Sequence, residues 1–137
     1  MAENASEPAT GTVTGGVRIL LRLEGLALFA GMTLLYALWG GPWWLYAVLF
    51  LAPDLSFLAY LLGPKIGAWI YNAAHSEIIP LLMLTVGFGF APPLLLSVAL
   101  IWLAHIGADR ALGYGLKYGA GFGFTHLGRI GRQAQKI

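Results

Sequence analysis

The chain alternates long apolar stretches with short polar breaks, and this pattern predicts four membrane-spanning helices. The apolar stretches cover residues 19–39, 43–62, 66–90 and 93–106, the last extended by polar residues to Leu112. At a rise of 1.5 Å per residue, each can cross a hydrocarbon layer about 30 Å thick. Gly40-Gly41-Pro42 and Gly63-Pro64 mark turns so short that the helices they join must be antiparallel neighbours. The expected fold is therefore all-α, a four-transmembrane-helix bundle of up-down-up-down topology.

The eight lysines and arginines all fall on one side of this pattern. They lie at the start of the first stretch, between the second and third, or at and beyond the end of the fourth, and the other two connections are uncharged. By the positive-inside rule, both termini and the Lys65 turn are cytoplasmic. A charged fraction of only 10% and a hydrophobic fraction of 58% are typical of a multi-pass membrane protein. The basic residues are few and dispersed, so no nucleic-acid partner is expected.

Composition outside the spans predicts two tails. Residues 1–16 are small, polar and unpatterned, which is typical of a disordered N-terminal tail. Residues 17–116 form the four-helix transmembrane domain, and residues 117–137 a glycine-rich, basic cytoplasmic tail. Pro53 and Pro80 lie inside spans, where each removes a helical N–H group and predicts a kink that faces protein or water.

Ionisable side chains inside the spans form the sharpest chemical feature. Helical rise places Asp54, His75 and His105 at similar depth in three different spans, with Asp109 one turn beyond His105. Because ionisable groups in hydrocarbon are costly, they are candidates for a shared functional site. Two imidazoles and two carboxylates suit a divalent metal such as zinc, manganese or iron, and the chain has no cysteine to favour softer metals.

Three other interpretations of these four residues remain open. His105 and Asp109 have i,i+4 spacing, so they can satisfy each other as a purely structural pair. The same residues can relay protons or ions through the membrane. His75 and His105 can also ligate a haem from two adjacent helices, although the nearby carboxylates are awkward against a porphyrin.

Further polar residues complete the predicted site. Glu24 is either paired with an arginine or acts as the catalytic base of a hydrolytic metal site. Asn72 or Tyr71 can orient the imidazole of His75. Positions that can bind a substrate or an anionic lipid headgroup at the cytoplasmic side are Asn72, Arg110, Tyr114, Lys117 and His126.

Three segments carry a resemblance to a known family: LRLEGLALF, FLAPDLSFLAYLLGPKIGAWIYNAAHSEIIP and WLAHIGADRALGYGLKYGAGFGFTHLGRIGR. Over about residues 17–132 the chain resembles an uncharacterised group of small bacterial membrane proteins, domain of unknown function 4260. HIGADRALGYGLKY is the most distinctive block. The resemblance implies a four-helix protein of the bacterial inner membrane and brings no activity, cofactor or catalytic residue with it.

These observations lead to one main hypothesis. The protein is expected to hold a metal ion in a cytoplasm-facing polar site within the bundle, with hydrolysis of a lipid-linked substrate as the suggested chemistry. The alternatives are a proton-coupled transporter subunit and a non-catalytic membrane assembly protein. The lipid bilayer is the expected partner, an anionic headgroup a candidate ligand, and a homo-oligomer a candidate assembly.

Overall fold

A computed structural model describes residues 12–90, 93–119 and 124–129. The helices are α1 (Gly15–Trp39), α2 (Trp43–Leu51), the 3-10 helix η1 (Ala52–Leu62), α3 (Pro64–His75), α4 (Ile78–Phe90) and α5 (Pro93–Leu112). Two short strands follow, β1 (Phe124–Thr125) and β2 (Gly128–Arg129), and they pair antiparallel. Four segments are long and apolar enough to cross a membrane: Gly15–Trp39, Trp43–Leu62, Pro64–Phe90 and Pro93–Leu112. The expected helical architecture of a multi-pass membrane protein with four spans is confirmed.

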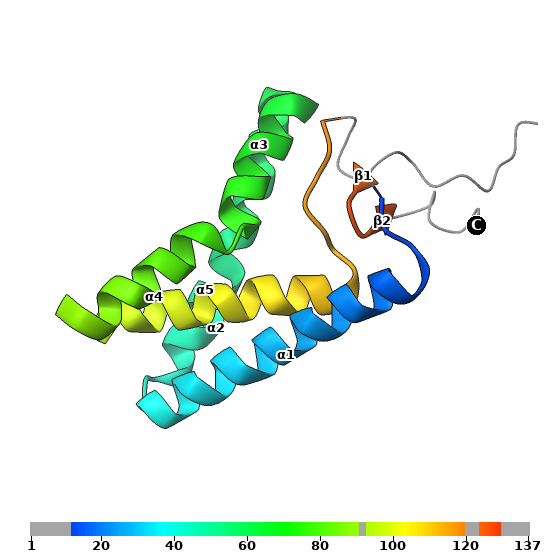
Figure 1. Ribbon diagram of the computed structural model, residues 1–137. Coiled ribbons are helices and arrows are strands. Elements are labelled where there is room, and N and C mark those ends of the chain that lie inside the picture. The colour runs from blue at the N-terminus through cyan, green and yellow to red at the C-terminus, as the bar shows by residue number, and fades with distance from the viewer. Residues whose placement is uncertain (1–11, 91–92, 120–123, 130–137) are drawn as a thin grey trace, which may run out of the picture.

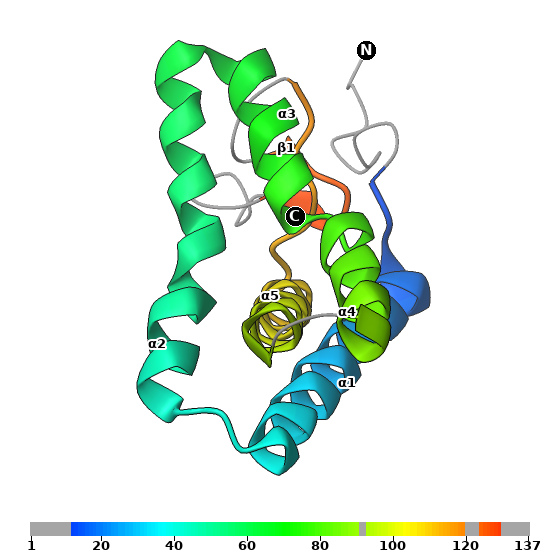
Figure 2. The same cartoon turned by 90° about the vertical axis from the view of Figure 1, so that its left-hand side faces the viewer.

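Helix α5 is the centre of the molecule. More than half of its apolar window is buried (56%), compared with 11% or less in the other three spans. Helices α1, α2 and α4 surround it, as Figure 2 shows in a view down its axis. Leu96, Leu100 and Ile101 of α5 form a core with Tyr36 of α1. The outer faces of the surrounding helices keep large apolar side chains exposed, as contact with lipid requires.

Both prolines inside spans lie close to an interruption of the α-helix. Pro53 has no N–H to donate to the Leu49 carbonyl, and the N–H of Ala52 donates to it instead. This hydrogen bond spans three residues instead of four, and it begins the 3-10 helix η1, which continues to Leu62. In the third span the helix breaks at residues 76–77, just before Pro80. The α-helix is therefore interrupted near both prolines, by a 3-10 helix at Pro53 and by a complete break before Pro80.

The break lets the two halves of the third span pack against different helices. Helix α3 packs against η1, and α4 packs against α5. In Figure 1, α1 and α5 lie side by side, while α3 rises away from them and α4 returns toward α5. The bundle is therefore less regular than four straight helices would make it, and α5 meets the second and third spans where each of them changes direction.

Beyond α5 the chain turns back against the bundle. We call residues 113–119 and 124–129 the return segment. Lys117, Thr125 and Leu127 in it are buried, with at most 3% of their surface exposed, although residues from 117 onward were expected to form a tail. The N–H of Val13, before α1, donates to the His126 carbonyl, and α1 itself begins at Gly15. The rest of the two predicted tails, residues 1–11, 120–123 and 130–137, lies outside the described residues.

Candidate metal centre

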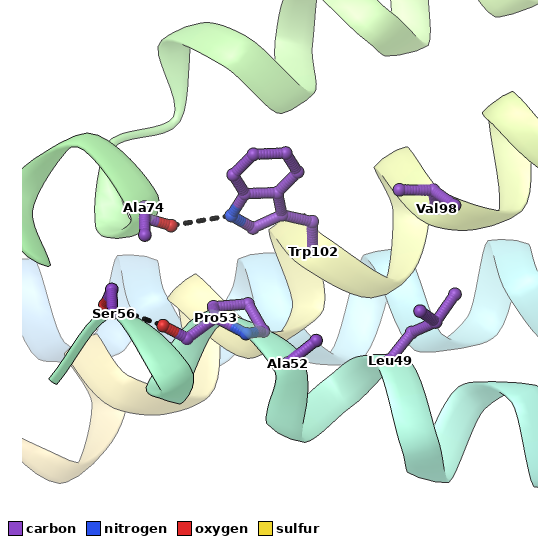
Figure 3. A pocket seen from close by; sticks show the side chains of 7 residues that line it. All are labelled: Leu49, Ala52, Pro53, Ser56, Ala74, Val98 and Trp102. Atoms are coloured by element: carbon purple, nitrogen blue, oxygen red, sulfur yellow. Dashed lines mark hydrogen bonds between the residues drawn. The ribbon is translucent and has the colours of Figure 1, made fainter. Parts of the chain in front are cut away.

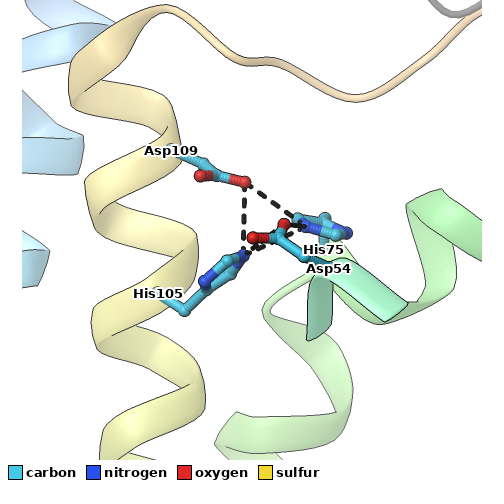
Figure 4. Close-up of side chains that lie close together, drawn as sticks. All are labelled: Asp54, His75, His105 and Asp109. Atoms are coloured by element: carbon cyan, nitrogen blue, oxygen red, sulfur yellow. Dashed lines mark hydrogen bonds and ion pairs between the residues drawn. The ribbon is translucent and has the colours of Figure 1, made fainter. Parts of the chain in front are cut away.

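Four ionisable side chains from three spans meet at one point (Figure 4). Asp54 comes from the first turn of η1, His75 is the last residue of α3, and His105 and Asp109 lie one turn apart on α5. Each offers one ligand atom, and these atoms all lie within 4.8 Å of one another. The four residues are the ones whose depth in the membrane suggested a shared site, and the structure brings them together.

The spacing within this cluster is close to that of a tetrahedral metal site. The Nε2 atoms of His75 and His105 are 3.2 Å apart. Nε2 of His75 lies 3.5 Å from Asp54 Oδ1 and 3.3 Å from Asp109 Oδ2, and Nε2 of His105 lies 3.3 Å from each. A tetrahedral zinc ion with bonds of about 2.0–2.1 Å needs ligand atoms about 3.3–3.4 Å apart. Five of the six separations are therefore within a few tenths of an ångström of the required value.

His75 is held so that one ring nitrogen faces the cluster. Its Nδ1 atom lies 2.9 Å from the carbonyl oxygen of Tyr71, and since a carbonyl only accepts, Nδ1 carries a hydrogen and donates it. In the neutral ring, Nε2 then presents a lone pair to the cluster. The ring also stacks on Tyr71 at 3.8 Å between centroids and 9° between planes. A histidine that donates its second N–H to a carbonyl is the usual arrangement of a metal ligand.

His105 is fixed by burial instead. Its side chain is 2% exposed on the central helix, and the Phe50 ring packs edge-on against it at 5.3 Å. Asp109 is 18% exposed, and Asp54 is the open member at 54%. The two imidazoles are therefore buried and fixed in place, and the cluster is accessible on one side, at Asp54.

Charge in the cluster favours a cation. With both imidazoles neutral, two ionised carboxylates leave two negative charges inside the spans. Nε2 of each imidazole lies within 3.5 Å of both carboxylates, so a cation among the four atoms would contact both negative charges. A divalent cation would balance both carboxylates in a region where uncompensated charge is costly.

Bis-histidine haem ligation does not fit this geometry. Two nitrogens on opposite sides of one iron would be about 4 Å apart at ordinary metal–nitrogen bond lengths. The two Nε2 atoms are closer than that, and carboxylate oxygens of Asp54 and Asp109 lie within 3.5 Å of them. A porphyrin ring between the imidazoles would overlap these carboxylates.

Two predicted site residues lie apart from the cluster. Glu24 is exposed on α1, and no salt bridge joins it to Arg18, Arg22 or Arg110 in the part of the chain that the structure describes. Tyr114 is 41% exposed just beyond α5, where its N–H donates to the Asp109 carbonyl. The structure does not bring Glu24 to the four ligand atoms, so the proposed chemistry does not rest on it.

Asn72 and Lys117 hold the return segment over the site. The Asn72 amide donates to the Lys117 carbonyl at 2.8 Å and accepts from the Lys117 N–H at 2.6 Å. The Lys117 ammonium lies 4.9 Å from the centroid of Tyr71, the ring on which His75 stacks. Burial lowers the pKa of Lys117 to about 8, while Asp109 acts in the opposite direction. Asn72, predicted to orient His75 or to bind substrate, instead orients the segment that carries a cation toward Asp109.

Arg110 and His126 also have positioning contacts. Nη2 of Arg110 donates over 3.4 Å to the carbonyl of His75, which the break after α3 exposes. Nδ1 of His126 accepts from the Leu116 N–H at 2.9 Å. Burial and the nearby Arg110 both lower the pKa of His126, which favours the neutral ring that this bond needs. Arg110 thus contacts the backbone of a cluster residue, whereas His126 holds the return segment together beside Lys117.

An apolar cavity beside the centre was not predicted (Figure 3). It has a volume of about 310 Å³, and the residues that line it are Leu49, Ala52, Pro53, Ser56, Ala74, Val98 and Trp102. The Trp102 indole N–H donates to the Ala74 carbonyl at 2.6 Å, which fixes the ring at its edge. One available signal was the spacing, because Trp102 precedes His105 by three residues and so shares its helix face.

The chain belongs to a protein family described as "Domain of unknown function (DUF4260)", which matches residues 18–130. The match covers all four spans except the first residues of α1, together with the whole return segment. Searches of curated proteins and of solved structures each found no match to this chain.

Proposed function

We propose that the cluster of Asp54, His75, His105 and Asp109 is a metal centre, with zinc as the best-fitting ion and manganese or iron as the alternatives. The observation that carries this proposal is the set of five separations of 3.2–3.5 Å among nitrogen and oxygen ligand atoms. Zinc accepts imidazole and carboxylate ligands together in a tetrahedron, whereas magnesium and calcium prefer sites made of oxygen alone.

The accessible side of the centre suggests a hydrolytic role on a lipid-linked substrate. If Asp54, the exposed ligand, leaves the metal, a zinc ion held by the other three residues would have an open position for water and would lower the pKa of that water. The chain's own residues hold the imidazoles in place, leave the Asp54 side open, and place the Lys117 ammonium near Asp109. Lys117 and Arg110 would attract an anionic group toward the centre.

The distribution of basic residues supports a specific placement in the cell. We place the protein in the bacterial inner membrane with both termini in the cytoplasm, because its lysines and arginines gather at one end of the spans. The return segment then lies on the cytoplasmic side of the centre. A substrate would reach the metal from the bilayer or from the cytoplasm.

Elemental analysis of the protein purified in detergent tests the metal directly. Near-stoichiometric zinc, manganese or iron is expected in the wild type, and a loss to background is expected in His105→Ala. His126→Ala is the matched control, because His126 is the one histidine of the chain outside the ligand set. Equal metal contents in wild type and His105→Ala would refute the proposal.

Cobalt replacement guards against a variant that simply fails to fold. The metal-depleted wild type should take up Co²⁺ and show the intense visible absorption of four-coordinate cobalt, which reports ligand geometry and needs no enzyme assay. Asp109→Asn, which keeps side-chain shape, should weaken or shift this band. Six-coordinate, pale cobalt that is unchanged in Asp109→Asn would contradict a site built from these four residues.

A proton relay is the second candidate, and the direct contact of the two Nε2 atoms favours it. Two imidazoles at hydrogen-bond distance, flanked by carboxylates, can pass a proton between the α3 and α5 faces. Metal-free wild-type protein in liposomes would then conduct protons, and His105→Ala would not. Tight metal binding together with no proton flux selects the metal centre over the relay and over a purely structural or assembly role.

A further inference from the structure

Two hollows lie on either side of the candidate metal centre, in order along the molecule. The apolar cavity is lined by Val98 and Trp102 of α5, ahead of His105 in the helix. A larger hollow of about 630 Å³, which we call the basic groove, lies beyond Asp109, between α3 and the return segment. From the membrane interior to the cytoplasmic edge, the apolar cavity comes first, then the metal centre, and then the basic groove.

The apolar cavity suits a hydrocarbon chain. Its lining is almost entirely aliphatic or aromatic, and its one hydroxyl, on Ser56, already donates to the Pro53 carbonyl at 2.7 Å. The cavity belongs to the membrane-spanning part of the helices, where acyl chains are the surrounding solvent. Its volume is at the lower end of the range of about 300–1,000 Å³ that is usual for ligand pockets.

The basic groove suits an anionic headgroup. Lys65 and Lys117 line it, together with Asn72 and Ser76. No acidic side chain of the described residues lines it. Trp69 and Tyr118 stand exposed at its edges, at 81% and 37%, as aromatic residues do at a membrane interface. The Lys117 side chain joins the groove to the centre, since its ammonium lies over Tyr71.

From this order we propose that the protein binds an anionic phospholipid, with one acyl chain in the apolar cavity and the headgroup in the basic groove. The segment between head and chain, which contains the ester and phosphate linkages of such a lipid, would then lie beside Asp54 and His75. The two hollows alone support this lipid-binding site. Only the consequence that this lipid is the substrate rests on the proposed metal centre.

Fluorescence quenching of Trp102 tests the occupant of the cavity. A single-tryptophan variant keeps Trp102 and replaces Trp39, Trp43, Trp44 and Trp69 with phenylalanine. It is placed in nanodiscs of phosphatidylcholine that contain a small fraction of chain-brominated phosphatidylglycerol or chain-brominated phosphatidylcholine. Bromine on a chain in the cavity should quench Trp102 by direct contact. For each engaged lysine, brominated phosphatidylglycerol should be about fivefold more effective than the zwitterionic lipid.

A second single-tryptophan variant provides the matched control. Trp44 is 68% exposed on α2 and lines neither the apolar cavity nor the basic groove, so bulk lipid alone should quench it, with little headgroup preference. In the Trp102 variant, Val98→Phe should fill the cavity and abolish the excess quenching. Lys65→Ala should reduce the preference for phosphatidylglycerol about fivefold without emptying the cavity.

The outcomes separate this proposal from the proposed function. Equal quenching of Trp102 and Trp44 by both lipids would overturn the lipid site, whatever the metal content. Strong quenching of Trp102 by both brominated lipids alike would overturn the headgroup assignment. Selective quenching by the anionic lipid in His105→Ala protein, which should lack metal, would support the lipid site even if elemental analysis refutes the metal centre.

Discussion

The two sides of α5 differ in how closely and how regularly the neighbouring helices pack against them. Toward α1, the helix is packed so closely that Gly25 and Gly107 have no room for side chains, and both helices are continuous there. Toward η1 and α3, the neighbours are a 3-10 helix and a helix that ends at His75. The four ligand atoms and the apolar cavity lie on this second side.

This difference has a physical cause. A regular helix in lipid satisfies all its backbone groups internally, so two such helices need only close van der Waals contact. A broken helix exposes carbonyls that require partners, and polar side chains gather where such partners are needed. The His75 carbonyl receives Arg110, and the Tyr71 carbonyl receives the His75 ring. We call the side of α5 toward η1 and α3 the irregular side, and the side toward α1 the regular side. The irregular side can therefore hold polar side chains that the regular side would exclude.

Filling the contact between α1 and α5 should have the largest effect on stability. In Gly107→Leu, the new Cβ would lie 2.5 Å from the backbone nitrogen of Phe29 and 2.6 Å from the Gly25 carbonyl oxygen. Backbone atoms cannot move aside as side chains do, so we expect a loss of about 3 kcal/mol or more. Gly31→Leu is the control, because no atom lies within 4 Å of the new Cβ. Thermal unfolding in detergent, followed by tryptophan fluorescence, would show whether the two variants differ.

Removing the metal should have the next largest effect, and it should act only through the irregular side. If free zinc is about 100-fold above its dissociation constant, binding stabilises the folded protein by about 2.7 kcal/mol. A chelator should therefore lower the melting temperature of the wild type but not that of Asp54→Asn. Gly25→Ala, a variant of the regular side, should start from a lower melting temperature and still respond to the chelator. A wild-type melting curve that ignores both zinc and chelator would contradict this.

Sequence reasoning was most successful where one physical rule was enough. Hydropathy and span length predict the four helices, and helical rise alone brings Asp54, His75 and His105 to one depth. The cost of ionisable groups in hydrocarbon then predicts that they meet, and they do. The prolines located both irregularities, because a missing N–H is a local property of the chain.

The return segment could not be predicted in the same way. Lys117 is buried because its backbone pairs with the side chain of Asn72, 45 residues earlier in the chain. Composition suggests only a soluble, glycine-rich tail, since nothing local marks one backbone amide as the partner of a distant asparagine. The central position of α5 is likewise a result of packing, because all four spans are apolar enough to face either lipid or protein.

Lys117 predicts a pH dependence on the irregular side. Burial lowers its pKa from 10.5 to about 8, so between these values the unfolded chain binds more protons than the folded one. Stability should therefore rise with pH across this window, by at most about 1.4 kcal/mol per pH unit, and this contribution should be constant below it. Lys117→Met should lose the slope while keeping the buried chain. Unfolding midpoints measured from pH 7 to 11 would detect it, and a stability that falls between pH 8 and 10.5 would show that the charge is not desolvated.

The smallest effect should come from Tyr71, which contacts the centre without contributing a ligand atom. Tyr71→Phe keeps both the stacked ring and the backbone carbonyl that receives Nδ1 of His75, so zinc affinity should change by no more than about twofold. Tyr71→Ala keeps the carbonyl but removes the ring, and the imidazole can then tilt about its hydrogen bond. A stacking contact of about 0.5–1.5 kcal/mol corresponds to a two- to tenfold weaker affinity. Competition with a coloured chelator would measure both variants. If Tyr71→Phe and Tyr71→Ala weaken binding equally, the hydroxyl rather than the ring orients His75, and the stacking of the two rings is incidental.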